Sequence, residues 1–152
     1  MRATLVAGGL SALLAMPAAG ADLTARLPDG TEIARLEIAD GGEWCVLWNH
    51  SVQGFEVEDC YENRGGRMVL VRSHQPDFAA GLGHVPGRGR QVSDGDGGYL
   101  ILGIDEPVPG DAYVLRPGDM RVDHRLKAGE KVVSLSSAAP HERVRIALEP
   151  AS

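Results

Sequence analysis

The sequence contains few of the residues, and none of the short motifs, from which most catalytic and metal sites are built. Its only cysteines are Cys45 and Cys60, with no Cys-x-x-C pair, so a zinc site at these residues would need two more ligands. The HExxH zinc motif, the phosphate-binding loop and the Gly-x-Ser-x-Gly nucleophile elbow are all absent. These absences disfavour zinc proteases, nucleotide-dependent enzymes and serine hydrolases. We therefore predict no catalytic residue, no metal and no cofactor.

Basic residues are also in deficit. The 15 Lys and Arg are outnumbered by 21 Asp and Glu, which gives a net charge of −6 at pH 7. Surfaces that bind nucleic acid or anionic lipids are positively charged. We therefore expect no nucleic-acid partner, and the charge mainly indicates solubility.

Long apolar runs are missing except near the N-terminus. Arg2 precedes an apolar run over Ala3–Met16, and small residues follow at 17–21. This order is typical of a secretory signal peptide, with cleavage after Ala21. The run is shorter than the roughly 20 residues that span a bilayer, so retention as an uncleaved anchor is the less favoured alternative.

Removal of residues 1–21 leaves 152 − 21 = 131 residues, the size of one domain. We expect 22–152 to form a single domain in the periplasm or outside the cell, with no membrane insertion after the signal is removed. Two cysteines in an exported chain favour one disulfide.

Helical apolar spacing is absent after the signal, and short strand patterns separated by turn residues take its place. About nine strands at this spacing predict an antiparallel all-β sandwich or barrel. A long, irregular, glycine-rich loop is predicted from Ser73 to Gly98. Outside the central hairpin, the predicted strands are Asp22–Leu27, Thr31–Ile38, Arg67–Arg72, Tyr99–Ile104, Ala112–Leu115, Met120–Leu126, Lys131–Ser136 and Arg143–Leu148.

The central hairpin, Trp44–Glu62, carries both cysteines. Successive strand residues point to opposite faces. If Cys45 lies opposite Cys60, then Trp48 lies opposite Val57 and Trp44 opposite Tyr61. This register gathers the apolar side chains on a core face and places both thiols and three glutamates on the other, whereas a slip of one residue would bury the glutamates. We therefore predict a Cys45–Cys60 disulfide and a solvated glutamate face.

His50 is the leading candidate for a binding residue, with Ser51 and Glu58 beside it. Adjacent strand residues point apart, so His50 and Ser51 are not a nucleophile–base pair. In the predicted register His50 and Glu58 also lie on opposite faces, which favours a hydrogen-bonded structural role for the histidine.

Two further candidates lie in the predicted loop. Arg88 and Arg90 have the chemistry to bind a carboxylate. The segment Asp94–Gly98 is faintly similar to a calcium loop, but it lacks the later ligands and the helices of an EF-hand. We interpret it as a glycine-rich turn before a strand.

Three short motifs carry a resemblance to a known family. They are Asn49-His50-Ser51-Val52 followed by Glu58, then Asp77–Leu82 with Phe78 and Gly81, and finally His124-Arg125-Leu126. Together they resemble the His-Ser-Val…Glu family of small exported bacterial proteins of unknown function, whose genes often lie beside those of TAXI-class TRAP transporters. Gln53 and Gly83 depart from the glutamate and proline common in that family.

The resemblance implies an accessory role outside the cytoplasm near a TRAP transporter, with no established reaction. Together with the export signal, the all-β pattern and the lack of a catalytic constellation, it favours a non-enzymatic module whose partner is a TRAP transporter component. The alternative is a small-molecule or metal-binding module that uses His50, Glu58 and the loop at 74–98.

Overall fold

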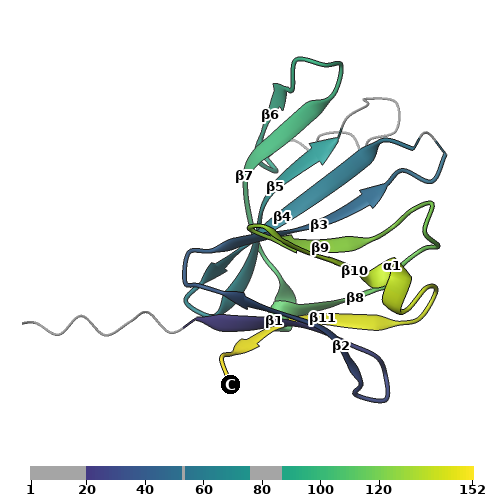
Figure 1. Cartoon of the computed structure of the whole chain (residues 1–152). Helices are drawn as coiled ribbons and strands as arrows, with labels where there is room; N and C mark the ends of the chain where they lie inside the picture. The colour runs from purple at the N-terminus through teal and green to yellow at the C-terminus, as the bar shows by residue number, and fades with distance from the viewer. Residues whose placement is uncertain (1–19, 53, 76–86) are drawn as a thin grey trace, which may run out of the picture.

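In a computed structural model the chain forms two antiparallel β-sheets that pack face to face (Figure 1). The structure describes residues 20–52, 54–75 and 87–152. The small sheet has the strand order β2-β1-β11-β8, and the large sheet has the order β10-β9-β3-β4-β5-β7-β6. The strands are β1 (Ala21–Arg26), β2 (Glu32–Ile38), β3 (Glu43–Asn49), β4 (Glu56–Arg64), β5 (Arg67–Gln75), β6 (Arg90–Ser93), β7 (Tyr99–Pro107), β8 (Ala112–Leu115), β9 (Arg125–Ala128), β10 (Lys131–Ser134) and β11 (Val144–Pro150).

The predicted all-β class is confirmed, and the architecture is a two-sheet sandwich. The first predicted hairpin is present as β1 and β2, with β1 beginning at Ala21. In β2, Ala34, Leu36 and Ile38 are buried while Arg35 and Glu37 are exposed, so the alternation turns one face of this strand to the core.

The predicted register of the central hairpin is confirmed. Cys45 lies opposite Cys60, Trp44 opposite Tyr61 and Trp48 opposite Val57. The two cysteines form the predicted disulfide. Trp44 is almost fully buried, because it packs with side chains of the small sheet, and Val57 is almost fully buried as well.

Asn63 joins the two turns at one end of the hairpin. Its side chain is fully buried, and Nδ2 donates to the carbonyl oxygens of Ile38 and Ala39 at 3.1 Å each. Its Oδ1 accepts a hydrogen bond from the N–H of Gly66 at 2.8 Å. One side chain therefore fixes the β2–β3 turn against the β4–β5 turn.

Two strand predictions are wrong at one end. The predicted strand Met120–Leu126 begins only at Arg125, because residues 119–124 form a turn in which the Asp119 carbonyl accepts from the N–H groups of Val122 and Asp123. The predicted strand Lys131–Ser136 stops at Ser134. There the Ser134 hydroxyl accepts from the N–H of Ser137 and caps α1 (Leu135–Ala138).

The predicted loop from Ser73 to Gly98 is wrong at two places, while the described residues 87–89 and 94–98 have no regular structure, as predicted. β5 continues through Gln75, and Arg90–Ser93 forms β6, which pairs with β7. Residues 76–86, which include Phe78 and Gly81, lie outside the described residues, as does the predicted signal segment up to residue 19.

The large sheet extends beyond the small one. Figure 1 shows β5, β6 and β7 rising away from the small sheet, whose edge strand on that side is β8. The inner face of the large sheet is therefore covered by the small sheet only in part.

The described residues include no helix long and apolar enough to cross a membrane.

Candidate functional site

His50 follows β3 and stacks on Phe55, with ring centroids 5.0 Å apart. Its Nδ1 accepts a hydrogen bond from the N–H of Val52 at 3.4 Å. These contacts are those of a structural histidine, although the residue also lines a cavity described below. Ser51 is exposed in the turn and does not line that cavity.

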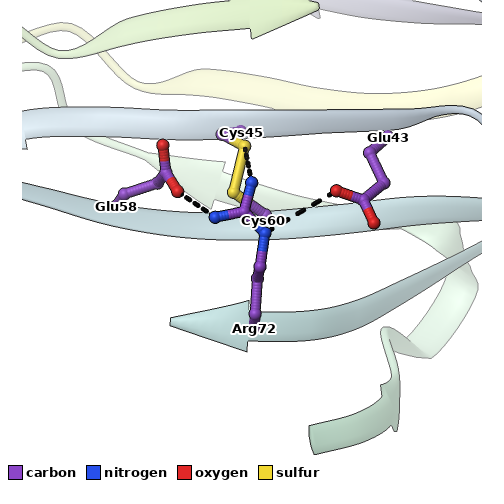
Figure 2. The surroundings of a disulfide bond; sticks show 5 residues. All are labelled: Glu43, Cys45, Glu58, Cys60 and Arg72. Atoms are coloured by element: carbon purple, nitrogen blue, oxygen red, sulfur yellow. Dashed lines mark hydrogen bonds and ion pairs between the residues drawn. A yellow bond between two sulfur atoms is a disulfide. The ribbon is translucent and has the colours of Figure 1, made fainter. Parts of the chain in front are cut away.

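Glu58 lies on the opposite face of the large sheet, beside the disulfide (Figure 2). Its carboxylate pairs with Arg72, which also contacts Glu43 at 3.6 Å and places Nη2 3.6 Å from Cys45 Sγ. His50 and Glu58 therefore lie on opposite faces of the large sheet, as predicted.

The face around Glu58 is less solvated than predicted. Cys45 and Cys60 are buried there with Leu47, and Arg72 lies over the Cys45 sulfur. Ligand atoms of Cys45, Glu58 and Cys60 lie within 4.8 Å of one another. Metal binding by cysteine requires a thiolate, and here the two sulfurs are bonded to each other.

The two predicted loop arginines have different surroundings. Arg90 begins β6 and is exposed. Arg88 lines the same cavity as His50, and its Nε donates to Glu106 at 2.9 Å. The structure therefore brings His50 and Arg88 to one cavity and leaves Arg90 outside its lining.

The Asp94 segment is the predicted turn. Asp94 Oδ1 accepts from the N–H groups of Asp96 and Gly98, and Oδ2 lies 2.9 Å from His74 Nε2. The hydrogen bond with His74, together with those from Asp96 and Gly98, lowers the pKa of Asp94. The carboxylate therefore fixes the loop before β7.

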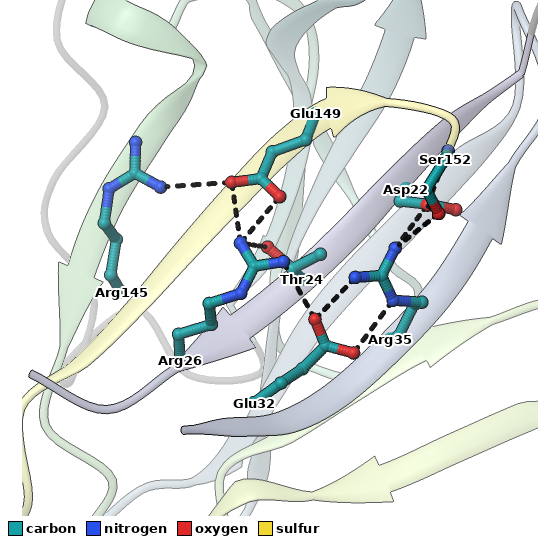
Figure 3. Close-up of polar contacts among 8 residues, drawn as sticks. All are labelled: Asp22, Thr24, Arg26, Glu32, Arg35, Arg145, Glu149 and Ser152. Carbon is teal, nitrogen blue, oxygen red and sulfur yellow. Dashed lines mark hydrogen bonds and ion pairs between the residues drawn. The ribbon is translucent and has the colours of Figure 1, made fainter. Parts of the chain in front are cut away.

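Charged side chains on the outer face of the small sheet pair with one another (Figure 3). Arg26 contacts Glu149 and Glu32, and Arg35 contacts Glu32 and Asp22. Burial alone would raise the pKa of Asp22, but hydrogen bonds from Ser152 and Arg35 outweigh burial and lower it. This network joins β1, β2 and β11, which is a structural role.

Two adjoining cavities lie on the inner face of the large sheet, where the small sheet ends. The polar cavity has a volume of about 260 Å³ and is lined by Trp48, His50, Val57, Asp59, Ser73, Gln75, Arg88 and Ile101. The aromatic cavity has a volume of about 180 Å³ and is lined by Val46, Trp48, Asp59, Tyr61, Tyr113, Leu115 and His124. Both include Trp48 and Asp59, so these two residues form the shared wall.

Asp59 is the functional candidate that the sequence analysis missed. It lies opposite Val46 on β3 and Ser73 on β5. Burial raises its pKa, against the opposing effects of a hydrogen bond with Ser73 and the positive charge of Arg88. The sequence contained one signal for this position: the alternation of strand residues places Asp59 between Val57 and Tyr61 on the predicted core face.

Stacked rings line the aromatic cavity. Trp48 stacks on His124 at 6.0 Å and Tyr61 on Tyr113 at 5.6 Å between centroids. Burial lowers the pKa of His124, and its Nδ1 accepts from the N–H of Gly118 at 3.1 Å. Burial also raises the pKa of Tyr61 to about 12, so this ring stays neutral at ordinary pH.

Residues 45–135 match a family described as a domain of unknown function, DUF1850. The chain belongs to this family. The match runs from the disulfide through β10, so the described wall residues of both cavities from Val46 to His124 lie within it. No curated protein and no solved structure matches the DUF1850 chain. The match agrees with the resemblance to a family of unknown function, while the link to a transporter stays a prediction.

Proposed function

We propose that this DUF1850 protein is a non-enzymatic module that binds a small organic molecule against Asp59. The observation that carries the proposal is the position of this carboxyl group, half-buried on the wall that two cavities share. Within the described part of the chain, Asp59 has no ion-pair partner. A buried charge without a partner is costly, and a ligand that neutralises it offsets that cost.

The size and lining of the cavities support a small ligand. Ligand pockets that take drug-sized molecules have volumes of about 300–1,000 Å³, whereas these cavities have about 260 and 180 Å³. The polar cavity combines an aromatic wall with convergent polar groups, which is the usual composition of a binding site.

The contacts of Ser73 and His50 favour binding over catalysis. Ser73 is hydrogen-bonded to Asp59, and its Oγ accepts from Gln75 Nε2 at 3.1 Å. The His50 ring is stacked and its Nδ1 is engaged by Val52. These arrangements hold polar groups in place on the cavity wall, and neither resembles an activated nucleophile.

Thermal unfolding with a panel of small metabolites and divalent metal ions tests this function. A ligand that binds only the folded state at a hundred times its Kd stabilises the protein by about 2.7 kcal/mol. We expect an organic member of the panel to raise the midpoint, and Asp59→Ala to abolish that rise. Glu58→Gln is the matched control, because Glu58 precedes Asp59 on β4 and lies on the opposite face of the sheet, away from both cavities. A rise that both variants retain contradicts the proposal.

We further propose that the protein works outside the cytoplasm as an accessory to a TRAP transporter of the TAXI class. The disulfide fits an oxidising compartment, and the family resemblance supplies the partner. Val52 of the His-Ser-Val motif is 85% exposed at a loop tip, where a partner protein has access to it.

Co-purification with co-expressed TAXI-class transporter subunits tests this role. We expect one subunit to co-purify with the wild-type protein and to be lost with Val52→Asp. Val114→Asp is the matched control, since Val114 is also exposed but lies on β8. Failure of every subunit to co-purify contradicts the association, and the mass of the exported protein checks cleavage after Ala21.

A further inference from the structure

We propose that the aromatic cavity binds the alkylammonium group of a small organic cation, with Asp59 as its counter-ion. This inference rests on the proposed binding function and names the chemical class of the ligand. It is carried by two features of the same cavity: its aromatic walls and the carboxyl group of Asp59, which has no ion-pair partner within the described residues.

The walls of the cavity are largely aromatic. Trp48, Tyr61 and Tyr113 line the cavity with His124, and their stacked pairs come from β3, β4, β8 and the turn before β9. The face of an aromatic ring is electronegative and attracts an ammonium group. Tryptophan is the best of these rings, and Trp48 lies on the wall next to Asp59.

Asp59 makes no ion pair within the described residues, although the positive charge of Arg88 acts on it. Arg88 is paired with Glu106, and Arg125, next to His124, is paired with Glu56 at 2.7 Å and Asp123 at 3.1 Å. Burial lowers the pKa of His124, so this ring is neutral near pH 7. The carboxylate that remains selects a positive ligand group, and that group in turn favours the ionised form of Asp59.

The volume limits the group that enters. A water molecule occupies about 30 Å³ of liquid, so a cavity of about 180 Å³ holds a group of roughly six non-hydrogen atoms. Trimethylammonium and ethanolammonium groups have four non-hydrogen atoms each and fit within this volume. The polar cavity, with Ser73 and Arg88, receives whatever polar part the same molecule carries on the other side of the shared wall.

Isothermal titration calorimetry with choline, tetramethylammonium and ethanolamine tests the ligand class. The comparison ligand is 3,3-dimethylbutan-1-ol, which has the shape of choline without its charge, and succinate is the anionic comparison. We expect at least one cation to bind, and the neutral alcohol and succinate to bind at least tenfold more weakly. Equal binding of the neutral alcohol, or preferred binding of succinate, overturns the proposal.

Variants then locate the site on the full-length protein. Asp59→Asn is expected to weaken cation binding at least tenfold, and Trp48→Phe by roughly two- to thirtyfold, as expected for loss of part of a cation–π contact. Glu58→Gln should leave binding unchanged, and a retained disulfide with an unchanged circular dichroism spectrum shows that each variant is folded. Cation binding that both cavity variants retain overturns the proposal.

The failures of the two proposals are distinguishable. If a neutral or anionic metabolite from the thermal panel binds in a manner that depends on Asp59, the cation assignment is wrong and the binding function stands. If neither the binding of any panel member nor the binding of any of the cations depends on Asp59 or Trp48, both proposals are wrong.

Discussion

Glu58 and Asp59 are adjacent in β4, yet their carboxyl groups lie on opposite faces of the large sheet. Glu58 pairs with Arg72 beside the disulfide, whereas Asp59 lines both cavities. Successive strand residues alternate in direction, so one step along the chain separates an ion-paired carboxylate from a half-buried carboxyl group that has no ion pair within the described residues. This difference makes the two residues a matched pair for experiment.

Asp59→Asn is expected to raise the thermal midpoint of the ligand-free protein by a few degrees at pH 7. Burial raises the folded-state pKa of Asp59 above its ordinary value of 3.8. The stability that a group with a raised pKa contributes is present below its unfolded pKa and is lost as pH rises through the folded one. An amide does not ionise and avoids this loss.

The pH dependence provides the check. The advantage of Asp59→Asn should be seen at pH 7 and shrink as pH falls towards 3.8, where the wild-type carboxyl group is protonated. Glu58→Gln should instead lower stability by at most about 1 kcal/mol, because it weakens a partly exposed ion pair. A thermal midpoint at pH 7 that is lower for Asp59→Asn than for the wild-type protein would contradict the claim that burial of the ionised Asp59 carboxylate destabilises the fold.

Asn63→Ala is expected to lower the free energy of unfolding by about 3 kcal/mol, since it removes three hydrogen bonds, each with a net contribution of about 1 kcal/mol. The lost partners are the carbonyls of Ile38 and Ala39 and the N–H of Gly66. Urea denaturation measures the loss.

Asn49→Ala is the control for Asn63. Asn49 Nδ2 donates to the Arg121 carbonyl at 3.2 Å and its Oδ1 accepts a long hydrogen bond from Arg125 Nη2 at 3.5 Å, in a more exposed setting. Its loss should cost less than about 1 kcal/mol. Equal effects of the two substitutions would show that Asn63 does not fix the turns.

The central hairpin was predictable because its pattern leaves one acceptable register. Only the pairing of Cys45 with Cys60 sorts the apolar residues to one face, and β3 and β4 have that pairing. The residue at which the strand predicted at Met120–Leu126 begins was not predictable in this way. Alternating apolar residues satisfy both a strand and the turn that the Asp119 carbonyl actually closes.

The site was predictable only in part, because cavities depend on contacts between distant strands. His50 and Arg88 were candidates from the sequence, and both line the polar cavity. Asp59 lies on the predicted core face of its strand. The sequence did not reveal that β8 would be the edge strand of the small sheet and would bring Tyr113 to the same cavity as Asp59. That arrangement follows from sheet order, which no local pattern encodes.

His124 is expected to make the protein sensitive to mild acid. Burial lowers its folded-state pKa below the ordinary 6.5. The unfolded chain therefore takes up a proton first, and stability is lost as pH falls below 6.5 towards the lowered folded-state pKa. His124→Phe keeps a ring beside Trp48 but cannot titrate.

Urea midpoints between pH 7.5 and pH 5 measure this effect. The wild-type midpoint should fall over this range by more than that of His124→Phe, even though the variant loses the hydrogen bond from Gly118 and is less stable at pH 7.5. Parallel pH profiles for the two proteins would show that the imidazole of His124 is not held neutral by burial.

The last prediction concerns the Cys45–Cys60 disulfide, whose cysteines are separated by 15 residues. Chain entropy gives about 3 kcal/mol for a closed loop of this size, and the ladder and core that already hold β3 against β4 lower the expected effect to about 2 kcal/mol. The double variant Cys45→Ala, Cys60→Ala should lose this amount in urea denaturation, and reduction of the wild-type protein should reproduce the loss. Thiol titration of exported, denatured protein should find no free thiol. Two free thiols, together with equal stability of the oxidised and double-variant proteins, would rule out the bridge as a contributor to the fold.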